Sequence, residues 1–345
     1  MKINLISDTT TRPTQGMLDA MMSAKVGDDV FKEDETINLL EAKIANMFNK
    51  EAALFFPSGT MANQTAIKIH TQPGDQLICD KYAHVYNYEG GGVSFNSNAS
   101  CKLVDGNRGM MTAEQVRAAI NPPDFYHSPL TSLVCIENTT NKGGGACWDF
   151  KEIEKIRKVC DEHHLKYHLD GARLWNALVE KGETTQQYGN IFDTISVCLS
   201  KGMGCPIGSV LVGSKEDMDK ALRIRKILGG GMRQVGYLGA AALYALEHHF
   251  ERLQEDHDRA KEIGNTLKTL PFIKSVEPIE TNIVIFNLAD DVDEQAFLAT
   301  LKENDIYIIG MGQGKLRMVT HLDYTSEMHD QLLTILNGLT IKKHS

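Results

Sequence analysis

Short apolar runs that favour β-strands alternate with amphipathic helical patterns along most of this 345-residue chain. The expected strands are 53–56, 76–79, 102–104, 132–136, 167–169, 194–199 and 209–212. The expected helices among and before them are 15–24, 36–48, 61–70, 112–120 and 149–164. Strands that alternate with helices predict an α/β fold with a seven-stranded, mostly parallel sheet covered on both faces. Functional side chains are then expected beyond the carboxyl ends of the strands.

The last part of the chain has a different pattern. A long helical pattern over 234–267 carries one apolar stripe and is expected to link two domains. Beyond it, strand-like runs at 283–286, 306–309 and 316–319 and helical patterns at 293–303 and 326–336 predict a compact α+β unit. We therefore expect an N-terminal arm over 1–14 that contributes to the active site, a large domain over 15–245 and a small C-terminal domain over 246–345.

Charge and composition exclude several classes of function. The 36 Lys and Arg against 45 Asp and Glu give a net charge of −9, and the only basic run is the short segment 223–226. Nucleic acid and anionic membranes are therefore disfavoured as partners. The sequence has no apolar run of membrane-spanning length and no export signal at its N-terminus. The seven cysteines lack paired spacing, so we expect reduced thiols, a cytoplasmic location and no metal site.

One lysine lies between two of the expected strands, in the segment Ile191–Val212. Gly202 and Gly204 allow the backbone to turn, so the ε-amine of Lys201 is expected to emerge at a strand end from apolar surroundings. Such surroundings disfavour the ammonium form and leave a nucleophilic amine that suits Schiff-base chemistry. A single lysine is more often a solvated surface residue, so this interpretation depends on the residues that accompany it.

Two further features, taken with a lysine that forms a Schiff base, fit the cofactor pyridoxal phosphate. Asp170 ends a short strand-like run and precedes a glycine. A carboxylate there can keep the ring nitrogen of the cofactor protonated. After the run 53–56, Pro57 breaks the strand and Ser58, Gly59 and Thr60 lead into a helical pattern. The N–H groups and hydroxyls at such a helix N-terminus favour a phosphate.

Eight motifs between residues 7 and 321 carry a family resemblance. They are SDTTTRP (7–13), GDDV (27–30), SGTMAN (58–63), ENT (137–139), DGAR (170–173), SKG (200–202), GGGMRQ (229–234) and RMVTH (317–321). Together they resemble the low-specificity L-threonine aldolases of the threonine aldolase and beta-eliminating lyase family. The resemblance implies a pyridoxal-phosphate enzyme with the aspartate-aminotransferase fold, which is fold type I, and a smaller C-terminal α+β domain.

The resemblance also implies roles for several arginines and a lysine. Ser7, Arg173 and Arg317 would hold the substrate carboxylate, which a guanidinium can bind through two hydrogen bonds. Arg233 corresponds to an arginine that contacts the phosphate from a neighbouring subunit, and Lys226 would serve similarly. A closed homo-oligomer, a tetramer, is therefore expected, with active sites at subunit interfaces.

Two histidines are expected to act on the substrate. The resemblance implies that His84 stacks on the pyridine ring and, with His127, addresses the β-hydroxyl group. Histidine suits this task because its proton affinity lies near neutrality. His84 is the first candidate for the catalytic base, and His127 or an ordered water is the second. The pairs at 163–164 and 248–249 lie in charged helical patterns and are expected to be solvated.

Two positions depart from the family pattern. Phe31 stands where tyrosine is usual after Gly-Asp-Asp-Val, and Thr140 stands where histidine is common after Glu-Asn-Thr. Both motifs are expected near the site. The departures leave the cofactor residues intact but affect which β-substituent the enzyme accepts.

The implied activity is that of a carbon–carbon lyase, more closely an aldehyde-lyase. It would cleave L-threonine, L-allo-threonine and related β-hydroxy-α-amino acids to glycine and an aldehyde, a reaction of threonine catabolism and glycine biosynthesis. Another pyridoxal-phosphate lyase that eliminates a β-substituent would need the same cofactor residues. A nicotinamide-dependent dehydrogenase or a non-catalytic α/β binding protein is a more distant alternative, because no GxGxxG follows the first strand.

Overall fold

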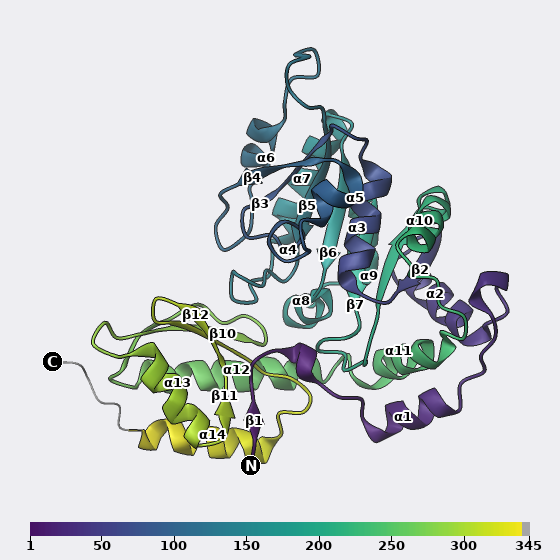
Figure 1. Cartoon of the computed structure of the whole chain (residues 1–345). Coiled ribbons are helices and arrows are strands. Elements are labelled where there is room, and N and C mark those ends of the chain that lie inside the picture. Colours follow the sequence, from purple (N-terminus) through teal and green to yellow (C-terminus); the bar gives the residue numbers. More distant parts are fainter. Residues whose placement is uncertain (340–345) are drawn as a thin grey trace.

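A central sheet of seven strands organises the computed structural model, which describes residues 1–339 (Figure 1). Its order is β2-β8-β7-β6-β5-β3-β4. The strands are β2 (Ala52–Phe56), β3 (Gln76–Asp80), β4 (Ser100–Val104), β5 (Thr131–Glu137), β6 (Lys166–Gly171), β7 (Thr194–Cys198) and β8 (Ser209–Gly213). β8 runs antiparallel to both of its neighbours, and the other pairs in the sheet are parallel. The prediction of a seven-stranded, mostly parallel sheet is confirmed.

Helices cover both faces of this sheet. They are α1 (Gln15–Met22), α2 (Glu35–Met47), α3 (Gly59–His70), α4 (His84–Asn87), α5 (Gly92–Ser97), α6 (Ala113–Ala119), α7 (Phe150–Glu162), α8 (Leu174–Lys181), α9 (Thr185–Ile191), α10 (Lys215–Ile227) and α11 (Gly236–His248). Ile78 and its neighbour in β3, Leu77, point to opposite faces, as successive strand residues do. Ile78 packs in one core with Ile37 of α2 and Ile153 of α7, and Leu77 packs in another with Ile67 of α3.

The remaining described residues form a smaller unit around a second core. Its four-stranded antiparallel sheet has the order β12-β13-β10-β9. The strands are β9 (Ile273–Val276), β10 (Ile283–Leu288), β12 (Ile309–Gly312) and β13 (Lys315–Val319), and the helices are α12 (Leu253–Lys268), α13 (Glu294–Glu303) and α14 (Ser326–Gly338). The N-terminal strand β1 (Ile3–Asn4) pairs in parallel with β11 (Ile306–Tyr307). The N-terminus is therefore attached to the C-terminal part of the chain.

Most expected elements of the large sheet differ from the observed ones by at most two residues at either end. Polar caps explain this agreement, because many helices begin after a Ser, Thr or Asp whose side chain accepts a backbone N–H. Thr112, for example, forms a capping box with Gln115 at the start of α6. Glycines and prolines mark several of the strand ends.

The prediction of one long helix over 234–267 was wrong, because the chain forms two helices, α11 and α12, with a turn between them. In that turn His249 is buried and its Nδ1 lies 2.7 Å from the carbonyl oxygen of Met203. Arg252, on the other side, binds Asp256 within α12 through two hydrogen bonds. The pattern contains no proline; the break coincides with the tertiary contact of His249, and the local pair of Arg252 and Asp256 lies at the start of the second helix. His249 is therefore not solvated as expected, whereas His248, His163 and His164 are exposed.

The strand expected over 306–309 is also divided. Ile306 and Tyr307 pair with β1, whereas Ile309 begins β12 and pairs with Arg317 of β13. The chain changes partner between these two short strands, and the apolar pattern of the sequence does not record which neighbour each residue has.

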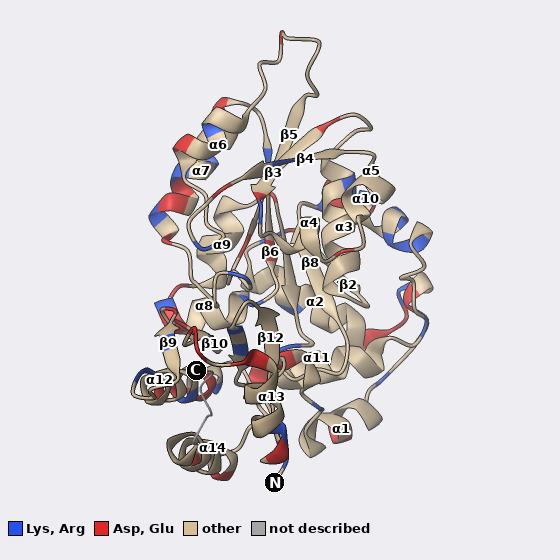
Figure 2. Ribbon diagram, turned by 60° about the vertical axis from the view of Figure 1, so that its left-hand side comes forward, with Lys and Arg blue, Asp and Glu red and all other residues tan. Residues whose placement is uncertain are grey.

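Charged residues are frequent on some of the helices that cover the sheet, such as α7 and α10. In Figure 2 acidic and basic residues are interspersed along α6 and α7, as on a solvated helix face. None of the helices among residues 1–339 combines the length and the apolar character that crossing a membrane requires.

Candidate active site

Six residues that the sequence singled out line one cavity at the carboxyl edge of the large sheet. The cavity has a volume of about 270 Å³. Its lining includes Ser58, Gly59, Thr60, His84, Asp170 and Lys201. These residues come from the ends of β2, β3, β6 and β7, and parallel strands bring their carboxyl ends to the same edge. The predicted convergence of Ser58, Asp170 and Lys201 at this edge is confirmed.

Lys201 lies in a tight loop between β7 and β8. The Gly204 N–H donates to the Lys201 carbonyl oxygen at 2.8 Å, and Gly204 has φ +76°, a conformation that favours glycine. The Lys201 Nζ lies 3.4 Å from the Cys198 Sγ. Met203 and Cys205, which follow in the loop, are buried. The loop therefore presents a single amine to the cavity from apolar surroundings.

Asp170 has one satisfied and one unsatisfied carboxylate oxygen. Its Oδ1 accepts the Ala172 N–H at 3.1 Å, whereas its buried Oδ2 has no hydrogen-bond partner among the described residues. Burial raises the pKa of Asp170, Glu89 adds to the rise, and His84 and Lys201 oppose it. A buried carboxylate oxygen without a partner is costly. The site would therefore be stabilised by a cationic N–H donor placed against Oδ2.

The N-terminus of α3 forms another side of the cavity. Ser58 caps the helix, and its Oγ accepts the Met61 N–H at 3.1 Å. The N–H groups of Gly59 and Thr60 precede the first bonds within the helix and have no partner among residues 1–339. Free N–H groups at a helix N-terminus bind anions such as phosphate.

His84 is held from two sides by carboxylates. Its backbone N–H donates to Glu137 Oε2 at 2.8 Å, and its Nδ1 lies 3.0 Å from Glu89 Oε1. Burial lowers the pKa of His84, but its hydrogen bond to Glu89 and the charge of Asp170 outweigh this effect, so the pKa is raised. Because an ionised carboxylate only accepts, the contact places a proton on Nδ1. The Nε2 atom is then the one available to other groups.

Glu89 and Glu137 were not identified from the sequence. Glu89 is buried and also accepts hydrogen bonds from the side chains of Asn63 at 2.9 Å and Gln64 at 2.6 Å. Ligand atoms of His84, Glu89 and Asp170 lie within 4.8 Å of one another. These amide donors occupy the Glu89 oxygens, so the cluster is better suited to orient His84 than to hold a metal ion.

The two arginines of the predicted carboxylate site have different surroundings. Arg173 is buried and binds Asp8 through two hydrogen bonds of 2.7 and 2.8 Å. Burial opposes ionisation of Asp8, but Arg173 outweighs it and holds the pKa of Asp8 at about 2. Asp8 comes from the N-terminal arm, next to the half-buried Ser7. The sequence did not identify Asp8, whose partner is 165 positions away.

Arg317 has no acidic partner within the described residues. Its Nη1 donates to Asn141 Oδ1 at 2.9 Å and its Nη2 to the Ile6 carbonyl oxygen at 3.1 Å. Its Nε is buried and has no hydrogen-bond partner among residues 1–339. Burial and the nearby charge of Arg173 lower the pKa of Arg317. A partly desolvated guanidinium that lacks a counter-charge is suited to bind a carboxylate from outside the chain.

Several residues named from the resemblance lie outside this cavity. His127 is in the exposed loop between α6 and β5, which projects at the top of Figure 1. That loop precedes β5, so it lies at the amino edge of the parallel sheet, opposite Lys201. Within one chain, His127 and His84 are therefore not brought together. The His127 ring packs instead against Phe125 and Tyr126.

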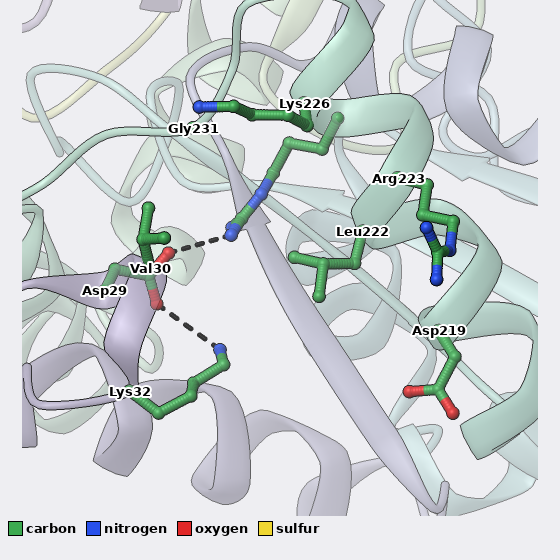
Figure 3. A pocket seen from close by; sticks show the side chains of 9 residues that line it. Asp29, Val30, Lys32, Asp219, Leu222, Arg223, Lys226 and Gly231 are labelled. Atoms are coloured by element: carbon green, nitrogen blue, oxygen red, sulfur yellow. Dashed lines mark hydrogen bonds and ion pairs between the residues drawn. The ribbon is translucent and has the colours of Figure 1, made fainter.

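Lys226 lines another, larger cavity of about 620 Å³ (Figure 3). Phe31 lies in the chain between Val30 and Lys32, which also line it, and Arg233 lies two positions after the lining residue Gly231. Leu222, Arg223 and Lys226 reach it from α10, and Asp29 and Lys32 lie across from them. Arg233 is 2.8 Å from Asp28, and the Phe31 side chain is exposed. None of these groups lines the cavity of Lys201 in the same chain.

Thr140 has little access to substrate. It is buried, and a Cβ at Gly143 would lie 2.3 Å from its Oγ1. The loop around Thr140 is packed too closely for an imidazole without rearrangement. Of the two departures from the family pattern, Thr140 is therefore buried within its loop, whereas Phe31 is exposed.

The fold and the cavity define a class of proteins, the fold type I enzymes that use pyridoxal phosphate. The chain belongs to the beta-eliminating lyase family, whose model matches residues 4–291. Low-specificity L-threonine aldolase 1 of Arabidopsis thaliana is 40% identical over 336 residues, 95% of this chain and 93% of that protein. The low specificity L-threonine aldolase of Escherichia coli is 37% identical over 326 residues, 94% of this chain and 95% of that protein.

A solved structure of a threonine aldolase from Leishmania major shares the fold. Its TM-score is 0.84 at 20% sequence identity, and the match covers 97% of this chain and 99% of that one.

The residues of the smaller cavity fit pyridoxal phosphate. The unpartnered Oδ2 of Asp170 can accept the N–H of a protonated pyridine ring, the free N–H groups of Gly59 and Thr60 can bind a phosphate, and the amine of Lys201 can bond to the aldehyde. All of these groups line the same cavity. Its unsatisfied polar groups therefore match the donors and acceptors of the cofactor.

Proposed function

We propose that the chain cleaves L-threonine, L-allo-threonine and related β-hydroxy-α-amino acids to glycine and an aldehyde. The observation that carries this proposal is the single cavity that holds Lys201, the unpartnered Asp170 and His84. Relatives of known activity support it, because low-specificity L-threonine aldolases are up to 40% identical over nearly the whole chain. The enzyme would then be an aldehyde-lyase of threonine catabolism and glycine biosynthesis.

Pyridoxal phosphate, when bound, supplies a covalent link to the substrate amine and a ring that accepts the electrons of the broken bond. Lys201 provides the amine that anchors the cofactor. Asp170 accepts the ring N–H and keeps the ring nitrogen protonated. Ser58, Gly59 and Thr60 bind the phosphate at the N-terminus of α3.

The substrate carboxylate is bound by Arg317, with help from Ser7 and Arg173. Arg317 supplies the guanidinium without a counter-charge. Arg173 is already paired with Asp8 through Nε and Nη2, so the N–H groups that it can offer the substrate are the two of Nη1 and the second of Nη2. By fixing the carboxylate, these residues would set the orientation of the substrate's Cα–Cβ bond in the cavity, which decides the bond that breaks.

His84 is the first candidate for the group that removes the proton from the β-hydroxyl. Glu89 binds its Nδ1 at 3.0 Å and leaves Nε2 free to accept that proton. The raised pKa of His84 strengthens it as a base. An ordered water is the second candidate. His127 remains a candidate only as a residue of another subunit, because its own chain holds it at the opposite edge of the sheet.

A closed homo-oligomer, with four subunits, would complete the site. Arg233 and Lys226 do not line the cavity of Lys201 in their own chain, and they would contact the phosphate in a neighbouring subunit. Phe31 lies in the chain between two residues that line the same cavity as Lys226, so its replacement of tyrosine would affect the neighbour's β-substituent pocket. We also expect a cytoplasmic location and an amino acid as the small-molecule substrate.

We retain the division into an arm over 1–14, a large domain over 15–245 and a small domain over 246–345. The separate cores of the two parts support it, and the pairing of β1 with β11 shows how the arm reaches the small domain. Residues 340–345 of the proposed small domain lie outside the described part of the chain.

Product analysis tests this function. The purified holoenzyme is incubated separately with L-threonine, L-allo-threonine and phenylserine, and aldehyde, glycine and ammonia are measured. Glycine and aldehyde in equal amounts are expected. Ammonia with an oxo acid would instead show elimination of a β-substituent, a reaction for which the same cofactor residues suffice.

A further inference from the structure

Glu137 ends β5 as a buried carboxylate, and no ion pair within residues 1–339 includes it. Its Oε2 accepts the backbone N–H of His84 at 2.8 Å, and its Oε1 accepts the backbone N–H of Asn141 at 2.7 Å. These donors belong to different loops, one after β3 and one after β5. A single carboxylate therefore fixes the distance between two loops at the carboxyl edge of the sheet.

Each of the two loops carries a group of the candidate active site. The first begins α4 with His84, which lines the cavity. The second carries Asn141, whose side-chain oxygen accepts a hydrogen bond of 2.9 Å from Arg317. Arg317 belongs to β13 of the small sheet. The chain of contacts thus runs from His84 through Glu137 and Asn141 to Arg317.

We propose that Glu137 is a positioning residue. Through His84 and Asn141 it fixes the position of the candidate base, His84, relative to the carboxylate-binding Arg317. This inference rests on the proposed function, because it presumes that Arg317 binds the carboxylate of an amino acid. Glu137 is not among the residues that line the cavity of Lys201. Its contact with Arg317 is indirect and runs through Asn141.

The double role requires an ionised carboxylate. Two N–H donors need two accepting oxygens, and a protonated carboxyl group turns one of its oxygens into a donor. Burial and the nearby charge of Asp170 raise the pKa of Glu137 to about 7, although the two N–H groups and His84 oppose this. Arg173 and Cys135 also interact with the carboxyl group. The hydrogen bonds that hold His84 and Asn141 to Glu137 are therefore expected to weaken as the pH falls through about 7.

The substitution Glu137→Gln tests the proposal, because it keeps the shape of the side chain and removes one accepting oxygen. The dissociation constant of glycine is measured by calorimetry on the holoenzyme between pH 6 and pH 8.5. At the upper end of this range the variant is expected to bind glycine about five- to tenfold more weakly, the effect of one lost hydrogen bond. Near pH 6 the difference should shrink, since the wild-type carboxyl group is then protonated too.

Asp80→Asn is the matched control. Asp80 ends β3, accepts the backbone N–H groups of Tyr82 at 2.7 Å and Gly106 at 2.9 Å, and burial raises its pKa as well. Among residues 1–339, no hydrogen bond or ion pair links Asp80 to Arg317. It should therefore lower the melting temperature without a pH-dependent loss of glycine affinity.

Asn141→Ala provides a second variant that does not depend on a buried charge. Because Glu137 acts on Arg317 through Asn141, the two substitutions are expected to be non-additive, and the double variant should bind glycine about as weakly as one of the single variants. Equal affinity of wild type and Glu137→Gln at high pH, or a difference that does not change with pH, would overturn the proposal. Additive effects would overturn it too. If the wild type binds no glycine, the proposed function itself fails.

Discussion

The cavity beside α10 and the cavity of Lys201 differ in size and in how their charges are satisfied. In the larger one, Asp29 binds Arg225 at 2.8 Å and Lys32 at 3.3 Å (Figure 3). In the smaller one, Asp170 Oδ2 has no partner within residues 1–339, and the N–H groups at the start of α3 are free. A folded chain rarely leaves buried polar atoms unpaired. Unsatisfied groups, rather than volume, therefore mark the place where a ligand belongs.

The substitution with the largest expected effect is Lys201→Ala. It removes the amine that anchors the cofactor, so the visible absorbance of bound pyridoxal phosphate and the turnover of threonine should both be abolished. Absorbance spectra and aldehyde release measure the two effects.

Lys151→Ala, on α7, is the control for Lys201→Ala. Lys151 is exposed and lines neither cavity, so turnover is expected to stay within about twofold of wild type, as for most surface substitutions. If a Lys201→Ala variant still cleaved threonine, the cofactor could not be assigned to the cavity that Lys201 lines.

The second-largest loss of turnover is expected for Asp170→Asn. The amide keeps the shape of the side chain but no longer stabilises a protonated ring nitrogen, so the cofactor should stay bound while turnover falls about a hundredfold or more. The cofactor content is determined from the absorbance after release in alkali, and the rate from aldehyde production. Normal turnover would show that the unpartnered oxygen does not serve the ring.

The two arginines separate stability from binding. Arg173→Gln would leave the buried Asp8 without its counter-charge, and removing one member of a buried pair costs about 3–5 kcal/mol of unfolding free energy. The pKa of Asp8, lowered from 3.8 to about 2, makes this contribution pH-dependent. It is present above the ordinary pKa and is lost as the pH falls toward 2. Urea unfolding at pH 7 and pH 3 should therefore show a smaller deficit at the lower pH, and equal deficits would contradict the pairing.

Arg317→Gln should have the smallest effect on folding. The arginine has no acidic partner among the described residues, so its loss leaves no buried carboxylate unpaired. Binding of glycine, in contrast, should weaken by roughly 1.5–3 kcal/mol, the usual contribution of a charged hydrogen bond. The dissociation constant and the melting temperature are measured together. Unchanged glycine affinity would move the carboxylate site to Arg173.

The sequence predicted the cofactor residues because local rules place them. Lys201 follows a strand and precedes a glycine turn, Asp170 ends a strand, and Ser58 caps a helix. Each signal lies within a few residues of the chain. Strand ends in a parallel sheet meet at one edge whatever the details of packing, so the convergence of these three residues could be predicted as well.

The residues that the sequence missed depend on distant partners. Glu137 contacts a loop 53 positions away, and the partner of Asp8 is 165 positions away. A carboxylate with such partners has the same local pattern as one on the surface. The burial of His249 against Met203 was not predicted for the same reason, and the break between α11 and α12 was therefore not predicted either. The role proposed for His127 depends on another subunit, which the pattern of one chain does not describe.

The central claim is that Lys201 holds pyridoxal phosphate in the smaller cavity. Reduction of the holoenzyme with borohydride, followed by proteolysis and mass spectrometry, tests it directly. The account predicts a pyridoxyl adduct on the peptide that contains Lys201. An adduct confined to another lysine, such as Lys226 beside the larger cavity, or a chain without any adduct, would contradict it.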